Sequence, residues 1–228
     1  PRRPLGRWML AGLDRLSASR SKVTVARSRG GVKVRIEQSY RPARKRAKIG
    51  HVHEYTIAAD GSIRVRNTFE LPDALADVAR LGVRMTLARS QDRLTWYGLG
   101  PHETYPDRKA GGLIGRYSGT VSEQYVPYIV PQEHGNKEEV RWFKLVDAKG
   151  SGVRVDAARP LAFSASHLTP EDLTRAYHTS ELRPRDAVTV LMDACQRGLG
   201  TLSCGPDTIE KYRIKPGIYR LNYTLSAV

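Results

Sequence analysis

Apolar residues that alternate with polar ones in short stretches recur along most of this 228-residue chain. The clearest stretch is 62–71, where Ile63 and Val65 alternate with arginines. An alternation of period two places the apolar side chains on one face of a strand and the polar ones on the other. The pair Asp60-Gly61 directly before it predicts a tight hairpin turn, because glycine accepts a positive φ.

The same pattern predicts further strands about every ten residues, the spacing typical of an antiparallel β-sandwich. They fall at residues 23–25, 32–36, 51–58, 80–89, 92–97, 139–146, 152–157, 186–194 and 216–225. The Gly-rich segment 110–119 is expected to run extended along the surface. The predicted fold class is all-β, a large antiparallel sandwich forming a single domain over residues 1–228.

One short helix is predicted at 169–178. Thr169 suits the N-cap, Pro170 suits the first turn, and Glu171 and Asp172 complement the positive end of the helix dipole. Residues 1–20 place apolar side chains at mixed spacings, which fits either a short helix or an irregular N-terminal clasp.

Two loops concentrate polar side chains at turns fixed by glycine and proline. The strand before Gly98 stops at Gly98-Leu-Gly-Pro101, and a loop to Arg108 follows; the second loop spans 127–142. Rigid turns that carry acidic, basic and aromatic groups are good places for a binding site. A structural alternative is that Tyr-Pro-Asp-Arg is a tight turn braced by an Asp–Arg pair. The candidate site residues in these loops are His102, Glu103, Tyr105, Asp107, Glu133, His134, Asn136 and Arg141, and Asp207 and Cys204 follow in the Gly-rich loop 198–207.

The formal net charge of +15 is confined to one end of the chain. Residues 1–48 hold 15 Lys and Arg against Asp14 and Glu37, and the remaining 180 residues hold 23 basic and 21 acidic groups. The basic run 41–48 fits an anion or nucleic-acid contact, or a solvated hairpin tip. We favour the tip and predict no nucleic-acid partner, because no aromatic residue interleaves with the run to stack on bases.

Cysteine usage and hydropathy give further expectations. Two cysteines, Cys195 and Cys204, form no disulfide framework and fit a reducing cytosol, and the sequence leaves open whether they pair. The six histidines do not cluster around the thiols, so we expect no metal site. No segment approaches the roughly 20 apolar residues of a membrane span, so we expect no membrane partner.

The loop motifs resemble the C-terminal domain of the glycoside hydrolase family 2 β-galactosidases. The similarity rests on Trp96–Arg108, Pro127–Asn136 and Val140-Arg-Trp142, with support from Arg7-Trp8 and Gly198-Leu-Gly200. It runs over essentially the whole chain in the same order. The resemblance implies a galactose-mutarotase-like supersandwich, the fifth and small-chain-like domain of the enzyme, which closes one side of a galactoside pocket.

The resemblance also implies properties of the parent enzyme. Such enzymes are cytosolic oligomers that bind Mg²⁺ and a monovalent cation in other domains, so this domain itself is expected to hold no cofactor. Retaining hydrolysis needs two carboxyl groups about 5–5.5 Å apart, and the family carries its two catalytic glutamates on a central barrel. Nothing in this chain matches either motif. Glu103 and Glu133 are therefore interpreted as loop-bracing groups or acceptors for sugar hydroxyls, and no catalytic residue is assigned.

One position departs from the family. A tryptophan that contacts the sugar is expected just after the Gly-x-Gly pattern, where this chain has Ser203-Cys204-Gly205. A cysteine or glycine cannot replace the flat apolar surface of an aromatic ring. The contribution of the 198–207 loop to sugar binding is thus in question, with Asp207 as a polar substitute.

Four functions follow as hypotheses. The preferred one is a domain that completes the active-site cleft of a β-galactosidase acting on β-D-galactosides such as lactose, without activity alone. The others are a stand-alone carbohydrate-binding module, a mutarotase-like enzyme using a His and a carboxylate as acid and base, and nucleic-acid binding by residues 1–48. The expected partners are carbohydrate, the other β-galactosidase domains and further copies of the chain.

Overall fold

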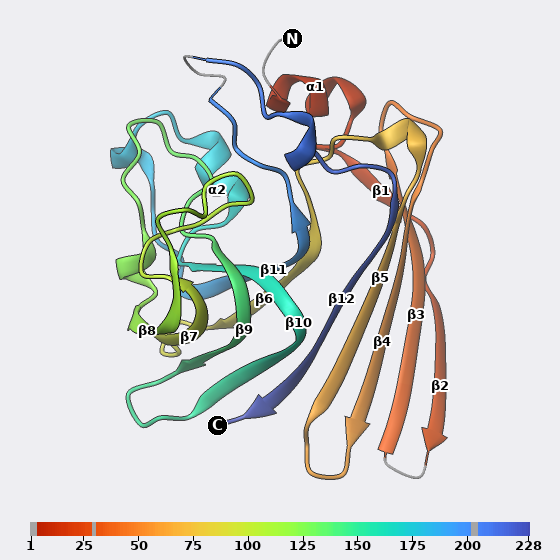
Figure 1. The fold of residues 1–228 in the computed structure, drawn as a ribbon. Coiled ribbons are helices and arrows are strands. Elements are labelled where there is room, and N and C mark those ends of the chain that lie inside the picture. Colours follow the sequence, from red (N-terminus) through yellow and green to blue (C-terminus); the bar gives the residue numbers. More distant parts are fainter. Residues whose placement is uncertain (1–3, 29–30, 202–204) are drawn as a thin grey trace. The chain divides into compact units, whose positions relative to one another are not determined.

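The computed structural model describes residues 4–28, 31–201 and 205–228. The chain separates into two compact units (Figure 1). Unit 1 contains Pro1–Leu81 and Ala194–Thr224, and unit 2 contains Gly82–Asp193 and Leu225–Val228. Residues 82–193 of the second unit are thus inserted in the sequence of the first.

Unit 1 is an antiparallel sheet with a short N-terminal helix. The strand order is β1-β3-β4-β5-β12, and β2 also pairs with β3. Figure 1 shows β2 to β5 as long neighbouring arrows. The elements are α1 Pro4–Ala11, β1 Leu16–Ala18, β2 Lys22–Ser28, β3 Gly31–Pro42, β4 Ile49–Ala58, β5 Ile63–Leu71, η1 Asp73–Leu75, η4 Glu210–Tyr212 and β12 Gly217–Ala227.

The hairpin between β4 and β5 forms as the sequence predicts. Gly61 has a φ of +82°, and the Asp60 carboxylate accepts hydrogen bonds from the backbone N–H (2.9 Å) and hydroxyl (2.7 Å) of Ser62. Beyond the turn, Ile57 pairs with Ile63 and Tyr55 with Val65. The turn fixes the register, and the register places Val65 in the core.

Unit 2 is also antiparallel, with the strand order β8-β7-β9-β10-β11-β6. Trp96, Phe143 and Phe163 on three adjacent strands are fully buried, and the two phenylalanine rings stack with centroids 4.2 Å apart. The elements are β6 Arg80–Ala88, β7 Arg93–Gly100, β8 Leu113–Thr120, η2 Ser122–Gln124, β9 Lys137–Val146, β10 Gly152–Ser166, α2 Pro170–Arg175, η3 Thr179–Glu181 and β11 Ala187–Gln196.

The all-β antiparallel class is confirmed, with differences at particular elements. Residues 113–120 are extended, as predicted, and form strand β8 through a pairing with β7 that the sequence did not predict. Strand β10 continues past 157 to Ser166 through a register shift against β9. A second α-helix, α1, occupies part of the N-terminal segment that the sequence left open.

Helix α2 begins where its capping signal predicts and ends earlier. Thr169 and Asp172 form a reciprocal capping box, in which each side chain accepts from the other's backbone N–H. The helix ends at Arg175 because Ala176 is already extended, so the predicted continuation to 178 is wrong. In the part of the chain that the structure describes, no helix is long and apolar enough to span a membrane.

One face of the unit 1 sheet carries a row of stacked rings. His51 and His53 lie on the same face of β4; His51 stacks on Phe69 at 4.4 Å and His53 on Tyr55 at 4.3 Å. The ring of His51 lies 3.0 Å from the Asn67 amide oxygen. The Nε2 atom of His53 is buried with no hydrogen-bond partner among the described residues. Burial, with a smaller effect from His51, lowers the pKa of His53 to about 4.

This pKa predicts that unit 1 loses stability in acid. In the unfolded chain the histidine binds a proton below its ordinary pKa of 6.5, whereas in the folded chain His53 stays neutral until the pH reaches its pKa of about 4. The free energy of unfolding should therefore fall as the pH drops from 6.5 to 4, by about 1–2 kcal/mol after allowance for the partly exposed ring.

Urea denaturation at several pH values measures this loss. His53→Gln should flatten the profile between these pH values, while His102→Gln, at an exposed histidine, should leave it unchanged. Identical profiles for His53→Gln and the unmodified chain would contradict the assignment.

Candidate functional site

The two polar loops predicted from the sequence lie against each other in unit 2. The backbone N–H of Thr104 donates to the carbonyl of Asn136 (2.8 Å), and the Asn136 side-chain amide donates to the carbonyl of Thr104 (2.8 Å). The Thr104 hydroxyl accepts from the N–H of Glu138 at 2.9 Å. Three bonds at buried positions thus fix the start of one loop to the end of the other.

Tyr105-Pro-Asp-Arg108 is a tight turn, as the structural alternative proposed. Tyr105 and Arg108 exchange backbone hydrogen bonds of 3.2 and 2.8 Å. The carboxylate that braces Arg108 is Glu103, which accepts from its guanidinium. The turn therefore holds Arg108 against an acidic residue two positions before the turn begins.

Glu103 joins the two loops. Its side chain is 9% exposed, and its Oε1 atom accepts from Arg108 and from the Tyr128 hydroxyl of the second loop. Its Oε2 atom accepts from the backbone N–H of Gly135 at 2.7 Å. Gly135 has a φ of +76°, and a Cβ there would lie 2.8 Å from the carbonyl oxygen of Gln124. The glycine lets the second loop approach closely enough for its amide to reach the carboxylate.

Beside Glu103 lies a buried phenol. Tyr105 is fully buried, and its hydroxyl has no hydrogen-bond partner among the described residues. Burial, followed by the charges of Glu133 and Glu103, raises the pKa of Tyr105. The hydroxyl thus stays protonated and is available as a donor. The side-chain oxygen of Asn136 is likewise buried without a partner in the described chain, which adds an acceptor nearby in the same loop pair.

The remaining predicted loop residues differ in exposure. His134 is buried, with Nδ1 3.0 Å from the Gln132 carbonyl and its ring edge-on to Tyr125. His102 is exposed, and Asp107 and Glu133 are half-buried. Arg141 donates to the carbonyl of Glu139 and lies 5.9 Å over the Tyr97 ring. The loops therefore bring Glu103, Tyr105 and Asn136 together and leave His102 at the surface.

Asp207 lies in unit 1, where it anchors its own loop. It accepts from Arg7 (2.6 Å), from Arg197 (2.9 Å) and from the N–H of Thr208 (2.8 Å). Burial alone would raise the pKa of Asp207, but the hydrogen bonds from Arg197 and Arg7 outweigh it and lower the pKa. Cys204 lies outside the described residues.

Comparison with known proteins identifies the family of this chain. The family model described as "Beta galactosidase small chain" matches residues 1–225. The chain belongs to this family. β-Galactosidases of Arthrobacter sp. (strain B7) and Actinobacillus pleuropneumoniae are 32% and 26% identical over 216 and 218 residues, covering 92% and 96% of this chain. That of Priestia megaterium is 34% identical over 146 residues, 64% of this chain and 14% of that protein.

This chain spans about a fifth of the length of such relatives, since the matches cover 21% of the Arthrobacter and Actinobacillus proteins. Similar solved structures include an α-galactosidase from Lactobacillus brevis (TM-score 0.48, 9% identity, 93% of this chain and 27% of that one). Another is a galactose mutarotase-like protein from Lactobacillus casei (TM-score 0.39, 12% identity, 91% and 73%). The fold assignment rests on the strands of this chain and on the family.

In this β-galactosidase small chain, sequence reasoning missed several residues. Arg108 and Tyr128 stand inside the quoted motifs, but nothing in the sequence paired them with Glu103. Arg197 directly precedes the Gly198-Leu-Gly200 pattern, and its partner Asp77 is far away in the sequence (2.5 Å between Nε and Oδ1). Lys137 is 3% exposed and lies 5.1 Å over the Trp96 ring; burial lowers the pKa of Lys137 to about 8.

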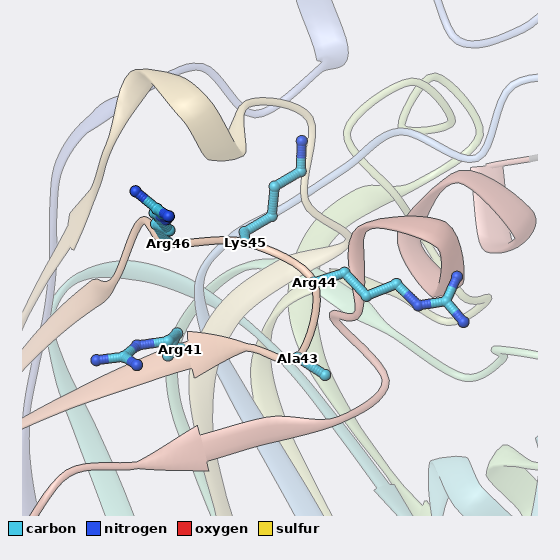
Figure 2. Close-up of a pocket in the computed structure, with 5 residues that line it drawn as sticks. All are labelled: Arg41, Ala43, Arg44, Lys45 and Arg46. Carbon is cyan, nitrogen blue, oxygen red and sulfur yellow. The ribbon is translucent and has the colours of Figure 1, made fainter.

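The basic turn between β3 and β4 lies in unit 1. Arg41, Arg44, Lys45 and Arg46 are exposed and border a hollow of about 660 Å³ (Figure 2). Figure 2 shows Arg44 pointing away from Arg41 and Arg46, so the side chains diverge. They make no ion pair within the described chain, an arrangement that agrees with the solvated hairpin tip. Over the same described residues, no group of three or more His, Cys, Asp and Glu could hold a metal ion.

Proposed function

We propose that this chain is the part of a β-galactosidase that completes the galactoside-binding cleft and stabilises the assembled enzyme. The observation that carries the proposal is the engagement of Glu103. Its two oxygens accept from Arg108, Tyr128 and Gly135, so the carboxylate organises two loops. A retaining glycosidase instead needs one carboxyl group as nucleophile and another as acid/base. We therefore assign Glu103 a structural role beside the reacting groups.

The loop pair has the polar character that a sugar-binding wall requires. His102 is exposed and Asp107 and Glu133 are half-buried, so they present polar groups at the surface, while the Tyr105 hydroxyl and the Asn136 side-chain oxygen lie buried. Pockets for small ligands use a few convergent polar groups among apolar walls. Family membership and the one-fifth share of the relatives' length support a parent polypeptide that supplies the remaining walls and the catalytic carboxyl groups.

The proposal extends to the partners and cofactors of the parent enzyme. The partners are the remaining β-galactosidase domains, a β-galactoside and further copies in an oligomer of a cytosolic enzyme. Mg²⁺ and a monovalent cation belong to the other domains.

The purified chain is predicted not to hydrolyse a chromogenic galactoside above the buffer rate. Calorimetric titration with galactose or lactose should also give no binding heat, because the other walls of the cleft are missing. Turnover by the chain alone that is lost in Glu103→Gln would overturn the proposal, and millimolar or tighter galactose binding would favour the carbohydrate-binding module. Mutarotation of α-galactose faster than buffer, measured by polarimetry, would favour the mutarotase-like enzyme.

A further inference from the structure

A second concave site lies in unit 2, next to the second polar loop, whose His134 packs edge-on against the lining residue Tyr125. It encloses about 340 Å³, within the range of roughly 300–1,000 Å³ found for small-molecule pockets. Four segments form it: Arg89 just after β6, Val121 to Tyr125 around η2, Ser166 to Leu168 at the end of β10, and Thr179 to Pro184 from η3 onward. None of its lining residues belongs to the predicted sugar-binding set.

The lining is apolar inside and polar outside. Val121, His167 and Leu168 are buried and form the floor, while Tyr125 and Leu182 are half-buried walls. The nitrogens of His167 face inward to the fold: Nδ1 lies 2.9 Å from the Ala187 carbonyl, and Nε2 lies 3.3 Å from Asp92. The imidazole is held by these contacts, so the floor is a fixed and largely apolar surface.

The charged group of the rim is Arg89. One of its terminal nitrogens donates to the Arg185 carbonyl at 2.7 Å, which fixes the direction of the side chain. No carboxylate pairs with Arg89 among the residues that the structure describes, whereas Arg185 is held by both oxygens of Asp172. A guanidinium has five N–H donors and is always charged, so Arg89 retains donors for an anion.

Two hydroxyl groups complete the rim. Ser122 and Thr179 are exposed lining residues on opposite segments, η2 and η3. A hydroxyl group can donate or accept, so these two can bind the polar end of a ligand beside Arg89. The site thus combines an apolar interior with one cation and neutral hydrogen-bonding groups at its edge.

We propose that this pocket, which we call the Arg89 pocket, binds a small amphipathic carboxylate. The apolar body of the ligand lies against Val121, Tyr125 and Leu168, and its carboxylate accepts from the Arg89 guanidinium. Charge-assisted bonds of a guanidinium to a carboxylate are among the stronger hydrogen bonds in proteins. None of the residues that would hold the carboxylate belongs to the predicted galactoside-binding set, so the proposal does not rest on the role of Glu103.

Calorimetric titration of the 228-residue chain with cyclohexanecarboxylate, and with the neutral analogue cyclohexylmethanol, tests the proposal. We expect the carboxylate to bind in the millimolar range or tighter and the alcohol at least about tenfold more weakly, the loss of one charged hydrogen bond. Arg89→Gln should weaken the carboxylate about tenfold or more and leave the alcohol unchanged. Arg93→Gln, at an exposed arginine outside the pocket, should change neither.

A second pair of variants tests the location. Thr179→Trp places a large ring at the rim and should abolish carboxylate binding, whereas Ser180→Trp, at the neighbouring exposed residue outside the lining, should preserve it. Unchanged melting temperatures establish that both variants fold. Equal affinity for the carboxylate and the alcohol, binding that survives Thr179→Trp, or no binding heat with millimolar carboxylate would overturn the proposal.

Discussion

Arg197→Ala is expected to lower the free energy of unfolding of unit 1 by about 3–5 kcal/mol, the usual cost of removing one partner from a buried ion pair. The Arg197 side chain is 3% exposed and donates to Asp77 (2.5 Å), Asp207 (2.9 Å) and the Thr208 hydroxyl (2.6 Å). Alanine removes the buried cation between the two carboxylates, and the more exposed Arg7, 2.6 Å from Asp207 and 3.7 Å from Asp77, replaces it only in part. Chemical denaturation measures the loss.

Arg213 provides the matched control for Arg197. It contacts the same Asp207 carboxylate, but at 3.4 Å and with 38% of its side chain exposed. Arg213→Ala should therefore cost only about 1 kcal/mol or less. If the two variants lost equal stability, the burial of Arg197 would not be the source of its effect. Arg197→Lys should lose an amount of stability between those of Arg197→Ala and Arg213→Ala, since an ammonium group restores the charge but not the several N–H donors of the guanidinium.

Glu103→Ala is expected to lower the free energy of unfolding by about 2–3 kcal/mol, because it removes a charged acceptor. The N–H of Gly135 and the Tyr128 hydroxyl then lose the carboxylate to which they donate. The effect should concentrate in the loops. Amide hydrogen exchange at Gly135 should become faster by a factor of about ten or more, in line with the loss of 1.4 kcal/mol or more of local stability. Exchange in the β9–β10 core should change less.

Glu123→Ala is the control for the loop effect. Glu123 also accepts a backbone N–H, that of Thr120 at 2.6 Å, but it lies on the exposed surface of the same unit. Its removal should cost under about 1 kcal/mol and leave the Gly135 amide protected. Unchanged exchange at Gly135 in Glu103→Ala would show that the carboxylate does not hold the loops together.

Local signals were sufficient to predict most of the strands and the hairpin turn at Asp60-Gly61. The Asp60-Gly61 hairpin and the Thr169 cap depend on residues a few positions apart, and both form as predicted. Strand β8 was missed because its pattern is interrupted by Gly115 and Gly119, and its pairing with β7 supplies the order that its own sequence does not signal. Tertiary pairing overrides weak propensity in such segments.

The contacts of the candidate site join residues that lie far apart in the sequence. The sequence predicted polar loops up to Arg108 and over 127–142, and it proposed a loop-bracing role for Glu103. The second loop ends at residue 136, because Lys137 begins strand β9. The sequence could not show that Glu103 binds Arg108 and Tyr128, since the latter lies 25 positions away. For Asp207 the sequence suggested a sugar contact, and the structure places its oxygens on Arg7 and Arg197. A carboxylate alone does not reveal which cation will reach it.

Unit 1 is built from two stretches of sequence separated by residues 82–193, and this has a consequence for its synthesis on the ribosome. Residues 82–193 emerge as one continuous piece and can acquire their fold as soon as they leave the exit tunnel, because domains fold as units from the N-terminal side. The first 81 residues must wait for residues 194–224, which carry Arg197 and most of strand β12. Until then, the edge of β5 that receives β12 is open to pairing with other nascent chains, and β12 closes this edge once it has been translated.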